Sequence, residues 1–195
     1  MSELITLPEP NQKGEMSLEQ TIAVRRSVRN FLSQPLTMEQ ISQLSWAAQG
    51  QDARSGYRTV PSAGATYPLE LFVVTADGLF HYLLAKHALE KLIERDLRAA
   101  LAAAAWGQGF IEEAPLTLVF AAQFSRTTGR YGQRGIRYVY MEAGHAAQNV
   151  HLQAESLGLG SVAVGAFDDA SVSKVLSLPK HLEPLYLVVV GYPRR

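Results

Sequence analysis

The chain has 195 residues, no cysteine, 47% hydrophobic residues, and 18 acidic residues balanced by 18 lysines and arginines. This length and composition suit one compact domain or one protomer of a tight oligomer. The lack of cysteine excludes disulfides, iron–sulfur clusters, thiolate zinc sites and a cysteine nucleophile. The balanced charge provides no field that would attract nucleic acid or anionic lipid.

The chain also lacks obvious targeting and membrane segments. Residues 1–15 have no apolar signal-peptide core, and the longest apolar run, residues 99–106, is too short to cross a bilayer. We therefore expect a cytoplasmic protein with no membrane or nucleic-acid partner.

The first residues predict an extended arm. Pro8, Pro10 and Gly14 discourage regular structure there. We therefore divide the chain into an N-terminal arm, residues 1–16, and a single domain, residues 17–195.

Two capping boxes predict the first two helices. S-x-x-Q at 17–20 and T-x-x-Q at 37–40 let a hydroxyl cap a helix start while the amide returns a hydrogen bond. The first helix should end at Arg25 or Arg26, and the second at a cap on Gly50. The second helix carries apolar side chains at helical spacing, at Met38, Ile41, Leu44 and Ala48.

The middle of the chain predicts a hairpin followed by a helix. A strand over 69–75 leads into the turn signal Asp77-Gly78, and a second strand follows over 79–84. Residues 87–106 predict a helix, and the Ala-rich end of this stretch has high helix propensity.

The C-terminal half alternates strands and helices. Residues 115–122 form an apolar run typical of a buried strand, and residues 135–157 predict a long helix closed by Gly158. The remaining elements are a strand over 161–164, a helix capped by Asp169 and ending at Leu176, and a strand over 185–190. This order lacks the regular unit of a doubly wound sheet. It favours an α+β layered fold with one mostly antiparallel sheet flanked by helices.

Residues 25–31, R-R-S-V-R-N-F, place three guanidinium groups and a hydroxyl within five residues. Arginine grips phosphates and carbonyls with paired hydrogen bonds. The cluster could therefore seat a phosphate and still present a cation to the polar edge of a ring. Taken alone, the cluster is more often a solvated basic face, and only the rest of the chain favours a binding role.

The region from Gly50 to Pro68 predicts a long loop, and loops of this length are usually functional or disordered. Within it, P-S-A-G-A-T-Y-P at 61–68 combines small residues with two stiff prolines. Small residues let a backbone approach a flat ligand closely. An ordinary surface turn is the alternative.

Several familiar chemistries are missing. The chain has no G-x-G-x-x-G between a strand and a helix, no Walker A motif and no G-x-S-x-G elbow. The five histidines show no metal-ligand spacing, so we expect packing or surface roles and no metal. Four arginines, 126, 130, 134 and 137, could line an anionic substrate's entrance, although a solvated face is favoured. Clustered arginine, small-residue loops and aromatics together fit a bound cofactor that carries its own chemistry.

From Leu18 to Tyr192 the chain resembles the FMN-dependent nitroreductase superfamily, most closely its SagB-type dehydrogenase-like members. The order and separation of several short segments carry the resemblance. These segments are 25–31, 61–70, E-A-G-H-A-A-Q-N at 142–149, L-G-L-G at 157–160, V-G-A-F-D at 164–168 and V-G-Y-P at 190–193.

The resemblance implies an FMN site. In the family, the opening R-x-S-x-[RK] element binds FMN, which assigns Arg25 and Ser27 to the phosphate and ribityl region and Arg29 to the pyrimidine edge. Arg26 lies beside them. A cation at Arg29 would stabilise the negative charge of reduced flavin near N1 and O2.

The remaining implied residues come from both subunits of an intertwined homodimer. The family's P-S-x loop, here Pro61, Ser62, Ala63 and Gly64, covers the partner's flavin. The backbone amide facing flavin N5 maps to the Gly165-Ala166 turn, where many members have Glu-Gly. The resemblance further assigns Gln108 to the pyrimidine and Arg194 and Arg195 to the phosphate.

The function expected from this resemblance is an FMN-dependent oxidoreductase. NAD(P)H would donate a hydride and leave, and a small quinone or nitroaromatic acceptor would then take electrons at the same flavin face. No catalytic side chain is assigned, since the cofactor performs the difficult step. Two alternatives are a SagB-type azoline dehydrogenase, for which Tyr131 or Tyr138 could act as base, and a non-catalytic flavin-binding protein.

Overall fold

A single seven-stranded sheet organises the computed structural model, which describes residues 3–52 and 54–194. The strand order is β1-β4-β3-β2-β5-β7-β6, and every pairing is antiparallel. The strands are β1 Leu4–Thr6, β2 Leu69–Thr75, β3 Gly78–Leu83, β4 Ala88–Ile93, β5 Leu116–Ala122, β6 Gly160–Val164 and β7 Glu183–Gly191. The predicted α+β class with an antiparallel sheet is confirmed.

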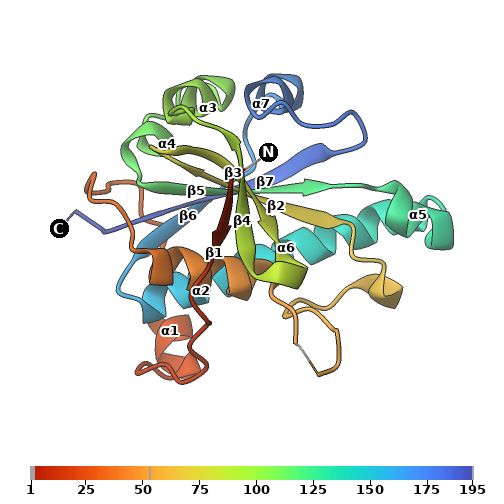
Figure 1. Cartoon of the computed structure of the whole chain (residues 1–195), viewed down its shortest axis with the longest axis horizontal. Helices are drawn as coiled ribbons and strands as arrows, with labels where there is room; N and C mark the ends of the chain where they lie inside the picture. The colour runs from red at the N-terminus through yellow and green to blue at the C-terminus, as the bar shows by residue number, and fades with distance from the viewer. Residues whose placement is uncertain (1–2, 53, 195) are drawn as a thin grey trace.

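Helices cover both faces of the sheet (Figure 1). Helices α1, α2 and α6 lie on one face, α3, α4 and α7 on the other, and α5 at one end. Their bounds are α1 Leu18–Val24, α2 Met38–Gln49, α3 Arg98–Ala104, α4 Phe110–Glu113, α5 Ser125–Tyr131, α6 Arg134–Ser156 and α7 Asp169–Val175. Short 3-10 turns span Ala63–Ala65 and Leu84–Lys86.

The central strand β5 shows why two cores form. All seven of its residues are buried. Because side chains alternate across a strand, Leu118 and Phe120 join the core under α2 and α6, while Val119 and Ala121 join the core under α3 and α7. A strand buried on both faces reads as a continuous apolar run, as predicted.

Local signals place several elements correctly. Both capping boxes form, with Ser17 and Thr37 accepting from the backbone of Gln20 and Gln40. The Asp77-Gly78 turn joins β2 to β3, and the long helix α6 ends before Gly158, whose φ is +70°. That left-handed conformation favours glycine.

The predicted helix over 87–106 is wrong. Its first part forms strand β4, which pairs with both β3 and β1, and only its end forms helix α3. His87 adopts a left-handed conformation, with a φ of +44°, and closes the turn into β4. Residues 88–93, A-L-E-K-L-I, have local helix propensity, but pairing with a strand on each edge outweighs it. This pairing involves distant residues, so the local sequence pattern does not reveal it. One cap also differs, since Asp168 caps α7 where Asp169 was expected.

The N-terminal residues are tied to the domain. Strand β1 extends the sheet beside β4, and Leu7 is buried in the core under α2 and α6. The Pro8 carbonyl oxygen accepts a hydrogen bond from the Ser42 hydroxyl and lies 2.9 Å from His87 Nε2. Among the described residues, no helix is both long and apolar enough to cross a membrane.

Candidate functional site

The arginine-rich segment leaves α1 and runs beside the edge strand β6. Ser27 forms a parallel bridge with Ser161, and the Val28 N–H donates to the Ser161 carbonyl oxygen at 3.0 Å. Gly160 permits this approach, because a Cβ there would lie 2.8 Å from the Val28 side chain. The segment is therefore fixed against the sheet by its backbone, which leaves its side chains available.

The three arginines of this segment differ in what they bind. Arg26 Nη1 donates to the carbonyl oxygens of Ala23 and Arg25, at 3.0 and 2.8 Å, and so binds the end of its own helix. Within the described chain, the guanidinium groups of Arg25 and Arg29 make no hydrogen bond or ion pair, and Ser27 is exposed. Arg25, Ser27 and Arg29 thus offer free donors to an anionic ligand.

A buried histidine lies behind the segment. His151 Nδ1 lies 2.7 Å from the Ser161 hydroxyl oxygen. Burial, with a further contribution from the positive charge of Arg25, lowers the pKa of His151 to about 4. His151 is therefore neutral near physiological pH and adds no charge to the site.

The C-terminal residues reach the same segment. The Arg194 N–H donates to the Asn30 carbonyl oxygen at 2.9 Å, and Arg194 Nη2 donates to the Phe31 carbonyl oxygen at 3.2 Å. Pro193 bridges Phe31. Arg194 thus lies beside the arginine-rich segment, while Arg195 lies outside the described residues.

The turn after β6 presents a free backbone amide. Gly165 and Ala166 are exposed, and the Ala166 N–H has no acceptor among the described residues. Gln108 Nε2 donates to the Ala166 carbonyl oxygen at 2.9 Å and so fixes the turn. From Ser161 to Gly165 the strand rises about 13 Å, at ~3.3 Å per residue. Strand β6 therefore separates the guanidinium groups from the amide.

The Pro61–Gly64 loop lies elsewhere. Arg130 Nη1 donates to the Gly64 carbonyl oxygen at 3.0 Å, and the Thr66 and Thr127 hydroxyl oxygens are 2.8 Å apart, so the loop packs on α5. In Figure 1, α5 lies at the opposite side of the molecule from α1 and the C-terminus. One chain therefore groups the predicted residues in two places.

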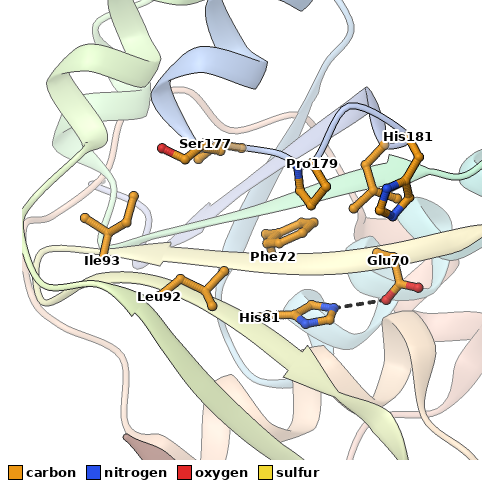
Figure 2. Close-up of a pocket in the computed structure, with 10 residues that line it drawn as sticks. Glu70, Phe72, His81, Leu92, Ile93, Ser177, Pro179 and His181 are labelled. Carbon is orange, nitrogen blue, oxygen red and sulfur yellow. Dashed lines mark hydrogen bonds and ion pairs between the residues drawn. The ribbon is translucent and has the colours of Figure 1, made fainter. Parts of the chain in front are cut away.

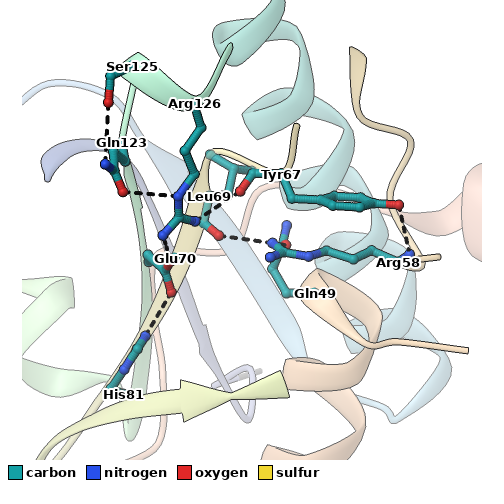
Figure 3. Close-up of polar contacts among 9 residues, drawn as sticks. All are labelled: Gln49, Arg58, Tyr67, Leu69, Glu70, His81, Gln123, Ser125 and Arg126. Carbon is teal, nitrogen blue, oxygen red and sulfur yellow. Dashed lines mark hydrogen bonds and ion pairs between the residues drawn. The ribbon is translucent and has the colours of Figure 1, made fainter. Parts of the chain in front are cut away.

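A polar network fixes this loop to the sheet (Figure 3). Arg126 pairs with Glu70 at 2.7 Å and donates to the Tyr67 carbonyl oxygen at 3.0 Å, while Glu70 lies 3.0 Å from His81 Nε2. Burial raises the pKa of Glu70, but the hydrogen bonds from His81 and Arg126 outweigh this effect and hold the pKa below its ordinary value. Glu70 is thus a carboxylate with two fixed partners.

Arg58 forms the other half of the network. Its Nη1 donates to Gln49 Oε1 at 2.6 Å and to the Leu69 carbonyl oxygen at 3.0 Å, and its guanidinium lies 4.6 Å from the centre of the Tyr67 ring. Arg126 and Arg130 are exposed, as a solvated face predicts, although each also donates to a backbone carbonyl, Arg126 to Tyr67 and Arg130 to Gly64. Arg134 and Arg137 are exposed.

A cavity of about 490 Å³ lies on the sheet face that carries α7 (Figure 2). Its floor is Phe72 stacked on His81, with 4.9 Å between ring centres, and Pro179 and His181 lie across from them. None of the predicted FMN residues lines this cavity. It is therefore separate from the β6 edge.

Some residues at these two places could not be singled out from the sequence. Ser161 and His151 lie in a strand and a helix without a motif, and Arg58 lies in an irregular loop. Glu142 offered one signal, an acidic residue on the apolar face of a predicted helix. No group of three or more His, Cys, Asp or Glu side chains within residues 3–52 and 54–194 could hold a metal ion.

The fold and the β6 edge define a class of protein: a layered α+β domain with free guanidinium groups and a free amide along one edge strand. Residues 22–192 match the model of the Nitroreductase family, and the chain belongs to this family. It is 45% identical over 183 residues to "Putative nitroreductase MJ1384" of Methanocaldococcus jannaschii, covering 91% of both chains. A solved structure described as a putative nitroreductase from Ralstonia eutropha superposes with a TM-score of 0.89 at 34% identity, covering 98% of this chain and 90% of that one.

Two more distant relatives have more specific names. The "FMN reductase [NAD(P)H]" of Bacillus subtilis is 25% identical over 86% of this chain. The microcin B17-processing protein McbC of Escherichia coli is 27% identical over 74% of it. The chain spans only 62% and 58% of the lengths of these two proteins.

Proposed function

We propose that this protein is an FMN-dependent oxidoreductase that takes a hydride from NAD(P)H and passes electrons to a quinone or nitroaromatic acceptor in a second step. Membership of the Nitroreductase family and the similarity to an NAD(P)H-using FMN reductase support this proposal. One observation carries it. The free guanidinium groups of Arg25 and Arg29 and the free Ala166 N–H lie along the same strand edge.

The residues at this edge fit FMN by their chemistry. Arg25, Ser27 and Arg194 would hold the phosphate and the ribityl chain through charge-assisted hydrogen bonds. Arg29 would place a cation at the pyrimidine, and the Ala166 N–H would orient the other end of the ring system. When bound, FMN supplies the hydride chemistry, and these residues bind it and stabilise its reduced charge.

We further propose a homodimer in which the Pro61–Gly64 loop of one protomer covers the flavin of the other. The separation of this loop from the β6 edge in one chain supports the arrangement. Large apolar side chains are also exposed on α1 and α6, with Leu18 60%, Ile22 57%, Tyr140 55% and Met141 50% accessible. Such surfaces mark protein–protein contacts.

The first experiment is an absorbance spectrum of the purified protein, followed by anaerobic addition of NADH and then NADPH. A flavin spectrum that bleaches with either nucleotide is the expected result. A protein that acquires no flavin even after incubation with FMN would contradict the cofactor assignment. Bound flavin that neither nucleotide reduces would contradict the NAD(P)H step and favour a non-catalytic flavin protein.

The similarity to McbC favours a second candidate, an azoline dehydrogenase acting on a modified peptide. Removing a proton from carbon requires a positioned base. Tyr131 and Tyr138 lie edge to face with 5.2 Å between ring centres, and Tyr131 adjoins Gly64. Flavin that stays oxidised with nicotinamides but is reduced by an azoline-containing peptide would select this candidate.

A further inference from the structure

A buried carboxyl lies beneath the Pro61–Gly64 loop and has no role in the function proposed so far. Glu142 occupies the buried face of α6 between Val139 and Ala146, and only 3% of it is exposed. Its Oε1 atom has no hydrogen-bond partner. Burying an unpaired carboxyl oxygen costs free energy, so a carboxyl kept at this position requires an explanation.

The neighbours of Glu142 set its proton affinity. Burial raises the pKa of Glu142 to about 7, although the Ser62 hydroxyl and the positive charge of Arg58 both act to lower it. Arg58 is directed to Gln49 and Leu69 and forms no ion pair with Glu142 in the described chain. Burial lowers the pKa of Arg58, while the charge of Glu70 raises it and the charge of Arg126 lowers it. Glu142 therefore exchanges a proton near neutral pH and is not a permanent ion.

Ser62 connects this carboxyl to open space. Its Oγ accepts a hydrogen bond from the Tyr67 N–H at 2.9 Å. Ser62 also lines a cavity of about 530 Å³, together with Tyr57, Gly64 and Arg130. A hydroxyl donates once and accepts twice. When Glu142 is protonated, its O–H can donate a hydrogen bond to Ser62 Oγ. The Ser62 O–H is then free to point toward the cavity.

We propose that Glu142 stores the proton of the acceptor half-reaction and that Ser62 delivers it to an acceptor bound in this cavity. The inference rests on the proposed function, in which the loop covers the partner's flavin. A quinone becomes a hydroquinone by gaining one hydride and one proton. In the proposed function the hydride would come from the bound, reduced FMN. The Ser62 hydroxyl proton passes to the quinone oxygen as the Glu142 proton moves to Ser62 Oγ, leaving a carboxylate that solvent reprotonates.

This arrangement suits a general acid at neutral pH. A proton donor works best when its pKa is close to the operating pH, because its protonated form is then populated and still acidic enough to transfer the proton. Glu142 acts through Ser62 and is a positioning residue, whereas Ser62 contacts the acceptor. Hydride transfer from a nicotinamide to the flavin draws no proton from this pair.

The first test measures the proton on Glu142 without turnover. In an infrared pH titration of the purified full chain with its flavin, we expect one protonated-carboxyl band that persists to near neutral pH. The band should vanish in Glu142→Gln and remain in Glu183→Gln, which alters an exposed carboxyl. A band that disappears with the ordinary carboxyls, or that persists in Glu142→Gln, overturns the proposal.

The second test measures the acceptor half-reaction. The flavin is reduced anaerobically with dithionite and mixed with a quinone over a range of pH. In the wild type, reoxidation should slow about tenfold per pH unit above neutral pH, whereas Glu142→Gln should be roughly 100-fold slower and independent of pH. Ser62→Ala should share this defect while keeping the infrared band, and Ser62→Thr should restore the rate.

Two controls separate this inference from the proposed function. Ferricyanide takes electrons without a proton, so Glu142→Gln should reoxidise at the wild-type rate with it. Failure of NAD(P)H to reduce bound flavin contradicts the proposed function alone. If NAD(P)H reduces the flavin and Glu142→Gln keeps the wild-type rate and pH profile with quinone, the proton-storage role is wrong.

Discussion

At the scale of single residues, two buried groups on α6 have pKa values shifted by burial in opposite directions. The pKa of His151 falls from 6.5 to about 4, and that of Glu142 rises from 4.5 to about 7. Both side chains are therefore held neutral over the same pH range. Their effects on stability oppose each other there, so these two contributions largely cancel in the wild type and single variants are needed to expose each one.

The His151 contribution has a defined sign. The unfolded chain binds a proton at pH 6.5 and the folded chain only near pH 4, so folding is disfavoured as pH falls through this window. The loss is on the order of 3 kcal/mol, since one pKa unit corresponds to ~1.4 kcal/mol. In His151→Gln, where the amide can still bond Ser161, only the opposing Glu142 contribution remains, so we expect urea unfolding to show stability that falls as pH rises from about 4.5 to about 7. An unchanged dependence in His151→Gln, or a similar change in the exposed control His145→Gln, would contradict the assignment.

Arg25 carries the most direct prediction about the cofactor. Its guanidinium is free in the described structure, and in the proposed site it binds the phosphate. Losing one charged hydrogen bond costs about 1.5–3 kcal/mol, or roughly 10- to 100-fold in affinity. We expect Arg25→Ala to weaken FMN binding by this amount in a fluorescence titration. Arg95→Ala, at an exposed arginine between β4 and α3, is the control. Unchanged affinity would remove Arg25 from the site.

At the scale of elements, the sequence predicts most clearly what is local. Both capping boxes, the Asp77-Gly78 turn and the buried run of β5 depend on neighbouring residues, and all appear in the structure. Strand β4 depends on two partners, one of them β1 near the N-terminus. Its local sequence favours a helix, and no short pattern could have corrected that prediction.

The same distinction holds for the candidate site. The R-R-S-V-R motif and the Gly165-Ala166 turn were visible as short segments, and the structure places both at β6. The pairing of Arg126 with Glu70 joins residues far apart in the chain, so Arg126 resembled a solvated arginine. Its contact with Glu70 depends on the antiparallel pairing of β2 with β5, because that pairing brings the start of β2 close to α5, which follows β5.

The contact between the arginine segment and β6 gives an element-scale prediction. Gly160→Ala would place a Cβ 2.8 Å from the Val28 side chain and push the segment away from the strand. Overpacking of this kind costs ~1–3 kcal/mol. We expect lower stability in urea unfolding and weaker FMN binding. Gly129→Ala, where a Cβ meets nothing within 4 Å, is the matched control.

A second substitution tests the cause of that loss. Val28→Ala removes the atoms that the new Cβ meets, so the double variant Gly160→Ala with Val28→Ala should regain part of the stability and affinity that Gly160→Ala loses. Energies of contacting residues are non-additive in this way. If the two substitutions lower stability and affinity additively, a clash between the new Cβ at position 160 and Val28 is not the cause of the loss.

At the scale of the whole molecule, the two groups of predicted site residues pose a geometric problem. The β6 edge holds the arginines and the free amide, while the Pro61–Gly64 loop is fixed by Arg126 and Arg130 at the end occupied by α5. The proposed symmetric dimer would solve it, because a two-fold axis can bring the edge of each protomer to the loop of the other. The exposed apolar side chains of α1 and α6 offer a surface for that contact.

Mixed dimers test this arrangement. Arg25→Ala breaks the part of the site on its own chain, and Ser62→Trp blocks the partner's flavin, so each variant alone should bind FMN weakly. If the sites are shared, a dimer of one chain of each kind has one intact site and one doubly broken site. Random mixing gives half mixed dimers, and about a quarter of all sites should regain wild-type affinity in a titration of the refolded mixture. If each site belonged to a single chain, mixing would restore nothing. A monomer in sedimentation that still binds FMN tightly would exclude shared sites altogether.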